Sequence, residues 1–287
     1  MALISLEDLE GLGEDEQLDE DITDNPEPMG EEQSDRLLTH WRAVASTHQV
    51  TVPTEMRGPI HEMARHNQQR EPVPFVPISC QEKMGEVMWE ERAYPAGKWA
   101  CVRQAEELYE QSISKSFMKL MRFICKENSA GGMRTRTHAA ACFSSTHGDG
   151  PLLHLRGVSF VFLLCIRAGG HLGLTVPVVS TVMVTADGQT LDKEVETGFY
   201  LPAAFQDAPL RPHDPDVEVV QRDAFTVVAR AFLGTTTEET VTRHSRLLRE
   251  LLDASAAERL RSDTYMVAVY ENPGVPHRRN EIWFLRR

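Results

Sequence analysis

The sequence FTVVARAFL at residues 225–233 begins the part of the chain that decides its fold class. A short run rich in Val and Phe is typical of a β-strand. A helix follows it, preceded by overlapping capping boxes in which Thr235 pairs with Glu238 and Thr236 with Glu239. The chain then closes with a predicted hairpin whose strands are YMVAVY (265–270) and EIWFL (281–285). Strand, helix and hairpin together predict an α+β domain.

The residues before this unit extend the same pattern. The clearest predicted helix runs from Val102 to about Lys126, where apolar residues recur at the spacing of one helix face. Further strands are predicted at Val158–Ile166, Leu174–Val184 and Gly198–Leu201, and Gly85–Arg92 is consistent with another. The run Thr190–Glu196 is too charged to be assigned as a strand. The apolar helix face consists of Ile113, Phe117, Leu120, Met121 and Ile124.

The N-terminal residues differ in composition from the rest. The chain has a net charge of −13, and residues 1–35 hold fourteen of its Asp and Glu but no Lys or Arg. Such a segment buries too little apolar surface to offset the entropy of ordering it, so it is predicted to be a disordered acidic tail. Residues 36–78 are predicted to form a helical arm and a Pro-rich linker, and residues 79–287 a single α+β domain.

The arm is predicted from two short helical patterns. Ser34 is a suitable N-cap for a helix with Leu37, Leu38, Trp41 and Val44 on one face. A second helix is predicted over residues 55–67. The prolines at 72, 74 and 77 then favour an extended chain.

The cellular compartment of the protein is predicted from its cysteines and from the absence of a secretory signal and of a membrane-spanning run. Five widely spaced cysteines without a secretory signal favour reduced thiols in the cytoplasm or nucleus. The longest apolar run, Val158–Ile166, is far shorter than the roughly 20 residues that cross a bilayer. The chain is therefore predicted to be intracellular, neither secreted nor transmembrane.

No catalytic, cofactor or metal motif is recognised. His61 and His66 lie five residues apart, which does not match the His-Glu-x-x-His spacing of a zinc-binding helix. His138, Cys142 and His147 lack the CxxC pair that would complete a tetrahedral zinc site. The chain is therefore expected to be no enzyme and to carry no cofactor and no metal.

Basic residues offer the one candidate surface. Four of them share the polar face of the predicted helix at 102–126, and two follow it. Such a face binds anionic lipid or phosphate, although a merely solvated face explains the pattern equally well. The acidic tail would compete with anions for it or capture a basic partner. The residues are Lys115, Lys119, Arg122, Lys126, Arg134 and Arg136.

From Met84 onward the order of elements resembles the matrix proteins of rhabdoviruses. The stretches that carry the resemblance are GEVMWEERAYPAGKW, VRQAEELYEQSISKSFMKLMRFIC, GFYLP, FTVVARAFLG, YMVAVY and EIWFL. The resemblance implies a twisted, mostly antiparallel sheet packed against helices. It also implies a virion component that self-associates and contacts the nucleocapsid and the inner membrane face. The acidic arm and the missing PPxY and PTAP motifs depart from that family.

Two functions from different classes follow. The first is a viral matrix-type adaptor that forms homo-oligomers and links nucleocapsid to membrane through the basic face, peripheral to the membrane and in the virion. In it, the acidic tail would bind the nucleocapsid or another basic protein. The second is an RNA-binding viral accessory protein, a movement protein or silencing suppressor, which predicts a steep salt dependence of RNA binding.

Overall fold

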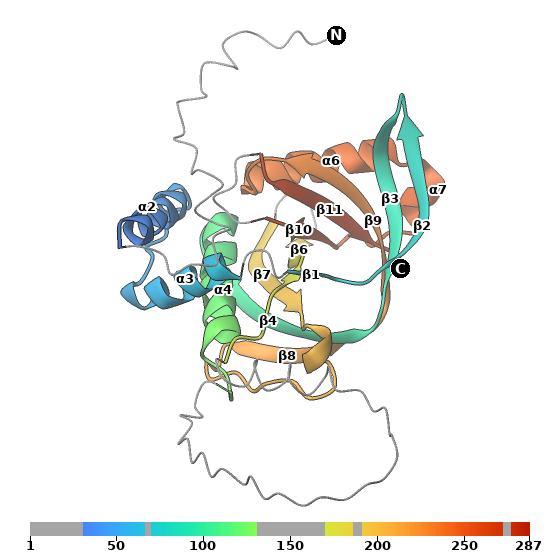
Figure 1. The fold of residues 1–287 in the computed structure, drawn as a ribbon. Coiled ribbons are helices and arrows are strands. Elements are labelled where there is room, and N and C mark those ends of the chain that lie inside the picture. The colour runs from blue at the N-terminus through green and yellow to red at the C-terminus, as the bar shows by residue number, and fades with distance from the viewer. Residues whose placement is uncertain (1–30, 67–69, 131–169, 186–190, 272–276) are drawn as a thin grey trace, which may run out of the picture.

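The computed structural model describes residues 31–66, 70–130, 170–185, 191–271 and 277–287 of the chain (Figure 1). Nine strands in these residues form one sheet, in which every neighbouring pair is antiparallel. The predicted α+β fold with a mostly antiparallel sheet is therefore confirmed. In chain order the strands are β2 (Val76–Lys83), β3 (Glu86–Tyr94), β4 (Gly97–Ala105), β6 (Val178–Val184), β7 (Leu191–Tyr200), β8 (Val217–Arg222), β9 (Phe225–Leu233), β10 (Thr264–Val269) and β11 (Arg279–Leu285).

The sheet is built from the same unit twice. In the first unit, strand β4 is followed by helix α4 (Tyr109–Cys125) and by strands β6 and β7. In the second, β9 is followed by helix α6 (Glu238–Leu251) and by β10 and β11. The strand order β2-β3-β9-β11-β10-β6-β7-β4-β8 places the two units back to back, joined by β10 and β6. The strand before each unit pairs with the other unit, β3 with β9 and β8 with β4.

The two long helices cover the same face of the sheet. Helix α4 packs on β4 and β7, and α6 packs on β11. The side chain of Thr237 caps α6 by accepting a hydrogen bond from the Thr240 amide. The predicted capping boxes at 235 and 236 therefore begin the helix slightly early. Two short helices complete this part, η3 (Ala203–Phe205) and α7 (Ala254–Glu258).

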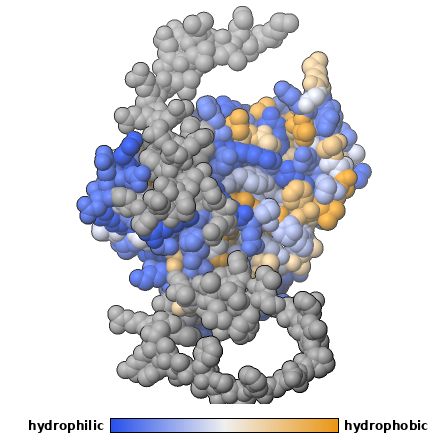
Figure 2. Space-filling model, in the orientation of Figure 1, coloured by the Kyte–Doolittle hydropathy of each residue, from blue (hydrophilic) through white to orange (hydrophobic). Residues whose placement is uncertain are grey.

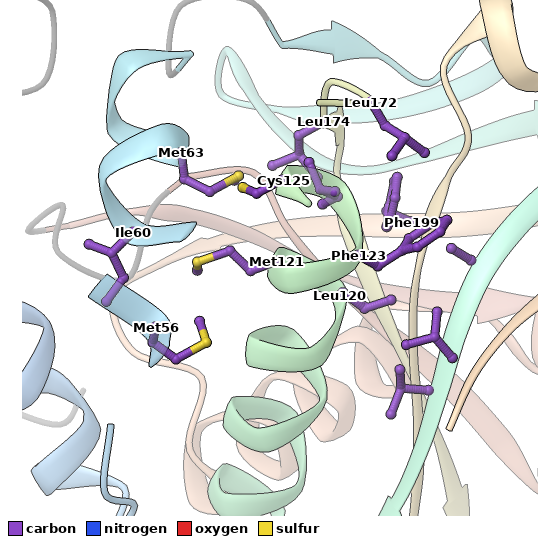
Figure 3. Close-up of a cluster of buried hydrophobic side chains, with 14 of the residues drawn as sticks. Met56, Ile60, Met63, Leu120, Met121, Phe123, Cys125, Leu172, Leu174 and Phe199 are labelled. Atoms are coloured by element: carbon purple, nitrogen blue, oxygen red, sulfur yellow. The ribbon is translucent and has the colours of Figure 1, made fainter. Parts of the chain in front are cut away.

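A helical arm precedes the sheet and packs against α4. It consists of α2 (Glu31–Thr47), η2 (Thr54–Met56) and α3 (Arg57–Arg65). Figure 3 shows Met63 of the arm directed at Cys125 of α4, and Met56 of the arm near Met121 of α4. These side chains share one buried apolar cluster, which attaches the arm to the domain.

After the arm the chain forms a strand of a separate two-stranded sheet and then the edge strand β2 of the main sheet. Strand β1 (Glu71–Pro72) pairs in parallel with β5 (Thr175–Val176), and β2 is hydrogen-bonded to β3. The Pro-rich stretch is therefore extended, as predicted, and β2 spans the predicted boundary between residues 78 and 79. The division into tail, arm and domain stays a prediction, and residues 1–30 of the tail lie outside the described residues.

On its other face the sheet curls around an aromatic cluster. The ring centroids of Trp99 on β4 and Phe225 on β9 are 6.3 Å apart, although four strands separate β4 from β9 in the sheet. Tyr94 stacks on Trp283 with ring centroids 4.7 Å apart, and Trp99 meets Tyr200 edge to face. These contacts bring the two halves of the sheet together on this face.

Three segments differ from the sequence predictions. Residues 102–105 end strand β4 and are not the start of the helix, because the whole segment pairs with β7 and Val102 pairs also with β8. The charged run at 191–196 is part of β7, and β8 was not predicted. Half-exposed strands alternate charged and apolar residues, which hides them in a search for apolar runs. The predicted strand Val158–Ile166 lies outside the described residues.

Hydrophobic surface is distributed unevenly. Figure 2 shows hydrophobic residues on the side that carries β2, β3 and β9, whereas the arm presents mostly hydrophilic ones. Among the described residues, no helix is long and apolar enough to cross a membrane. The exposed large hydrophobic residues include Phe75, Val76, Ile78, Met84, Val87 and Leu233.

A buried ion pair links β3 to β11. The Arg92 guanidinium donates to both carboxylate oxygens of Glu281, at 2.8 and 3.1 Å, and Glu281 is only 1% exposed. The Trp283 indole and the Tyr270 hydroxyl also donate to Glu281, each at 2.7 Å. Burial alone would raise the pKa of Glu281, but the charge and hydrogen bonds of Arg92 outweigh it and lower the pKa.

We expect Glu281→Gln to lower the free energy of unfolding by about 3–5 kcal/mol at neutral pH, because the buried Arg92 then keeps only the partly exposed Glu90 as a carboxylate partner. Since the folded-state pKa of Glu281 is lowered, its contribution is present above the unfolded pKa of about 4.3 and lost as pH falls through the folded value. Urea unfolding at several pH values measures both effects. Asp263→Asn, which breaks the exposed pair with Arg261, is the control and should cost at most about 1 kcal/mol. Equal losses in the two variants would contradict the prediction.

Candidate binding pocket

A pocket lies between the arm, helix α4 and the joined ends of β6 and β10. The space between its walls, including its open mouth, is about 970 Å³. The arm contributes Trp41, Val44, Ala45, His48, Val52, Met56, Ile60 and Arg70. The domain contributes Ile113, Ser114, Phe117, Met118, Leu174, Val176, Val178, Ser180, Thr197, Thr236, Val269, Tyr270, Glu271 and Arg278.

Two apolar helix faces form opposite sides of the pocket. Trp41 of α2 stacks on Phe117 of α4, with parallel rings whose centroids are 6.4 Å apart. Ile113 and Phe117 belong to the apolar stripe predicted for α4, and Trp41 and Val44 to that predicted for α2. Their outer turns are only partly buried, so the stripes line a pocket as well as a core.

The third wall exists because β6 pairs with β10. Val178 and Val269 face each other in this pairing, and both line the pocket. The chain leaves β10 through Tyr270 and Glu271 and returns through Arg278 at the start of β11, so these residues also reach the pocket. Residues 272–276 between them lie outside the described residues.

Cationic groups line this otherwise apolar pocket. Arg278 is 5% exposed, and burial is the main cause that lowers its pKa. Arg70 donates through Nη1 to the Tyr270 carbonyl oxygen at 3.0 Å, and burial lowers its pKa too. One carboxylate, that of the exposed Glu271, lies with these two guanidinium groups in the wall. Carboxylate groups of a ligand would pair well with guanidinium groups in so apolar a site.

His48 supplies the pocket with an imidazole. It is 8% exposed, and its Nδ1 lies 2.8 Å from the Ser114 hydroxyl oxygen. Burial, aided by the charge of Arg278, lowers the pKa of His48, whereas Glu110 acts in the opposite direction. The imidazole is therefore neutral near pH 7 and keeps a nitrogen lone pair.

Tyr270 connects the pocket to the buried ion pair. Its hydroxyl donates to Glu281, and burial and the Glu281 charge raise the pKa of the phenol. The phenol therefore stays protonated at physiological pH, and its hydrogen bond fixes the ring in the wall. Chemically, the pocket combines apolar surface, two guanidinium groups and one neutral imidazole.

The predicted basic face of α4 lies outside this pocket. Lys115 pairs with Glu106 at 2.7 Å, Arg122 with Asp214 at 2.9 Å, and Lys119 with Asp216. Lys126 is exposed. Arg134 and Arg136 lie outside the described residues. Binding of anionic lipid or phosphate by this face stays a prediction, although carboxylates already neutralise three of its cations.

The histidines considered for zinc are separated as well. The His61 ring nitrogen Nε2 lies 2.8 Å from the Ser34 hydroxyl, while the ring of His66 lies against that of His171 with centroids 4.1 Å apart. Among the described residues, no group of three or more His, Cys, Asp or Glu could hold a metal ion. His138, Cys142 and His147 fall in the part that the structure does not describe.

Sequence reasoning missed the charged and aromatic pocket residues. His48, Arg70 and Arg278 belong to no motif, and the chain brings them together from segments far apart in sequence. One usable signal was the half-exposed aromatic pair Trp41 and Phe117, since each lies on a predicted apolar face. That signal marks both residues as apolar contacts but does not show that they face each other.

Comparison with known proteins supports a different relationship from that predicted. Residues 71–285 match the family model of the SOUL heme-binding proteins. Heme-binding protein 1 of Mus musculus is 26% identical over 202 residues, covering 70% of this chain and 85% of the relative. Heme-binding protein 1 of Sus scrofa is 26% identical over 215 residues, covering 74% and 91%.

Solved structures add little. The crystal structure of a putative bacterial transcription regulation protein from Staphylococcus aureus MU50 covers 69% of this chain and 97% of its own, at 8% identity and a TM-score of 0.32. At that TM-score the likeness supports no inference about fold or function.

The family match corrects several predictions. The predicted rhabdovirus matrix relationship is wrong, because the match with SOUL heme-binding proteins covers the same part of the chain. The viral adaptor and the RNA-binding accessory protein are wrong for the same reason. The partners inferred from them, namely nucleocapsid, membrane surface, RNA and further copies of this chain, lose their basis.

The environment of His48 predicts its protonation. We expect His48 to titrate below pH 6.5 in the folded chain, because burial and Arg278 disfavour the imidazolium. Its contribution to stability is then present above about pH 6.5 and lost as pH falls towards the folded pKa. Arg278→Gln should raise the pKa of His48 without restoring 6.5, whereas Arg279→Gln should not. NMR titration of ¹³C-histidine-labelled protein measures this, and a wild-type value of 6.5 or higher would show that His48 is not buried as described.

Proposed function

The chain belongs to the SOUL heme-binding protein family, and we propose that it binds heme in the pocket between the arm, α4 and β10. The observation that carries this proposal is the composition of the wall, in which aromatic and aliphatic side chains surround two guanidinium groups and an imidazole. A heme has the complementary chemistry, since it is a flat apolar ring with two carboxylates and a central iron.

The apolar walls suit the ring. Trp41 and Phe117 offer stacked aromatic faces, while Leu174, Val178 and Val269 line the sheet side. Aromatic surfaces bind flat rings through burial and through offset stacking. The pocket is open to solvent, so its ligand would be partly enclosed.

The guanidinium groups suit the carboxylates. Arg70 and Arg278 are desolvated, as their lowered pKa values indicate, and a buried cation gains strongly from an anionic ligand. Glu271 is the only carboxylate among the described residues of the wall and is itself exposed. The electrostatics of the pocket therefore favour a dianionic ligand over a neutral one of the same shape.

Most residues that line the pocket belong to the domain that the family model matches, and fewer belong to the arm. The matched residues 71–285 include α4, β6, β10 and Arg278, but they exclude α2, η2, α3 and Arg70. Ligand binding is therefore proposed as a property of the matched domain, to which the arm adds a further wall.

A reducing intracellular compartment is the localisation that we propose with this function. Among the described residues, Cys101 and Cys125 are free and buried, while Cys80 is free and exposed. Burial raises the pKa of the Cys101 thiol to about 11 and that of Cys125 to about 12, so both remain protonated and unreactive.

Phe117→Ala should weaken heme binding about tenfold, because ring stacking contributes on the order of 1 kcal/mol beyond the loss of buried area. Absorbance titration of the purified chain with ferric heme measures the dissociation constant. The matched control is Phe225→Ala, which removes an equally half-buried aromatic ring that does not line the pocket. Absence of saturable heme binding by the wild-type chain would overturn the proposed function.

Arg70→Gln should weaken binding of heme about tenfold and leave binding of heme dimethyl ester unchanged, because charge-assisted hydrogen bonds contribute about 1.5–3 kcal/mol. The two titrations are compared in the same buffer. Arg279→Gln, which removes a nearby arginine outside the pocket, is the control. If the arginine change affects both ligands equally, Arg70 acts on the shape of the pocket and not on the carboxylates.

A further inference from the structure

The end of helix α2 places His48 with little freedom. The Gln49 amide donates to the Ser46 carbonyl at 2.9 Å, and the Val50 amide donates to the Ala45 carbonyl at 2.9 Å. Gln49 has a φ of 55°, the left-handed conformation that closes a helix with this pair of hydrogen bonds. His48 is therefore the C-cap residue of a Schellman motif, and its backbone is fixed by the helix end.

The side chain of His48 is oriented from the opposite wall. Its Nδ1 lies 2.8 Å from the hydroxyl oxygen of Ser114 on α4, and its Nε2 makes no hydrogen bond to any described residue. With Nδ1 donating to Ser114, Nε2 carries the lone pair. A hydrogen bond at one ring nitrogen that orients the other is the usual arrangement of a histidine metal ligand.

Other groups in the pocket are poorer candidates for a metal ligand. The Tyr270 hydroxyl is committed to Glu281, and burial keeps the phenol protonated. Met56 is 1% exposed and packs within the apolar cluster of α4. Met118 is partly buried and remains the alternative, with a thioether sulfur. Imidazole and thioether sulfur are both established axial ligands of heme iron.

Two other histidines near the arm are not candidates for the iron ligand. His66 and His171 lie ring against ring, and neither lines the pocket. Among the described pocket residues, His48 is therefore the one imidazole. It also lies before residue 71, where the family match begins, so the match assigns it no role.

We propose that His48, oriented by Ser114, is an axial ligand of the iron of bound heme, an inference that rests on the proposed function. Bound heme supplies an iron centre whose axial positions accept such a nitrogen. The arm then does more than cover the pocket, because it contributes an imidazole, which the described pocket residues of the matched domain lack. The arm and the domain together would form the complete site.

The test compares ferric heme with metal-free protoporphyrin IX in the wild type, His48→Ala and Met118→Leu. Absorbance and electron paramagnetic resonance report the iron ligands, and fluorescence quenching reports protoporphyrin binding. We expect His48→Ala to shift the Soret band, change the spin state and weaken heme binding at least tenfold, while protoporphyrin affinity stays within about twofold. Added imidazole should restore the wild-type spectrum. Met118→Leu, which removes the thioether sulfur and keeps an apolar side chain, should leave the Soret band and the spin state unchanged.

Ser114→Ala is a second variant that keeps the histidine and removes only its hydrogen-bond partner. It should weaken heme binding by about 10-fold to 100-fold, the usual effect of losing a partner that orients a metal ligand. Thermal unfolding of the ligand-free variants shows that each is folded. If His48→Ala does not fold, the comparison rests on Ser114→Ala and on His48→Gln, which keeps a polar side chain of similar reach.

The outcomes separate the two proposals. Identical heme spectra in the wild type and His48→Ala would overturn the role of His48, and so would a spectral change confined to Met118→Leu. In both cases heme and protoporphyrin would still bind, so the proposed function would stand. If the wild type bound neither ligand, the proposed function itself would fail, and the role of His48 with it.

Discussion

The antiparallel pairing of β6 with β10 is the interaction on which the rest of this structure depends. It joins two units of strand, helix and two strands, with register pairs from Thr264 and Met183 to Val269 and Val178. Because the pairing ends at Val178 and Val269, the described residues that follow β10 and begin β11 line the same pocket as the helix of the other unit. The pocket is a consequence of that meeting, since each unit supplies residues that the other lacks. Strands β3 and β8 also hold the two units together, because each precedes one unit and pairs with the other.

The charged groups in this apolar pocket explain why its residues suit the binding of a ligand better than the packing of a hydrophobic core. Arg70 and Arg278 are desolvated, and a cation in such surroundings gains more from an anionic partner than it would at the surface. Another buried guanidinium, that of Arg92, pairs with the Glu281 carboxylate at 2.8 Å. The pocket and this pair are linked through Tyr270, which lines the pocket and donates to Glu281. The buried Arg92–Glu281 ion pair thus fixes one wall of the pocket, which is also lined by Arg70 and Arg278.

The predicted relationship to rhabdovirus matrix proteins was wrong because only the order of the elements supported it. It rested on the sequence of strand and helix types, and many folds with an antiparallel sheet share such an order. The relationship to SOUL heme-binding proteins, at 26% identity with the mouse and pig relatives, extends over 202 to 215 residues. The basic face of α4 was noticed because its lysines and arginines are regularly spaced. Three of its four described cations proved to have carboxylate partners, two of them beside β8, a strand that was not predicted.

Local sequence determined much of the secondary structure and the α+β class. Hydrophobic periodicity identified β9, both strands of the last hairpin and the apolar stripe of α4, because each signal lies within one element. It failed for the charged N-terminal part of β7 and for β8, whose charged residues face outward and whose strand state depends on pairing partners distant in the chain. Only the tertiary structure decided the strand order, the curling of the sheet around Trp99 and Trp283, and the pocket. His48, Ser114 and Arg278 lie far apart in sequence and meet only because the arm, α4 and β11 pack together, a long-range arrangement that no local pattern encodes.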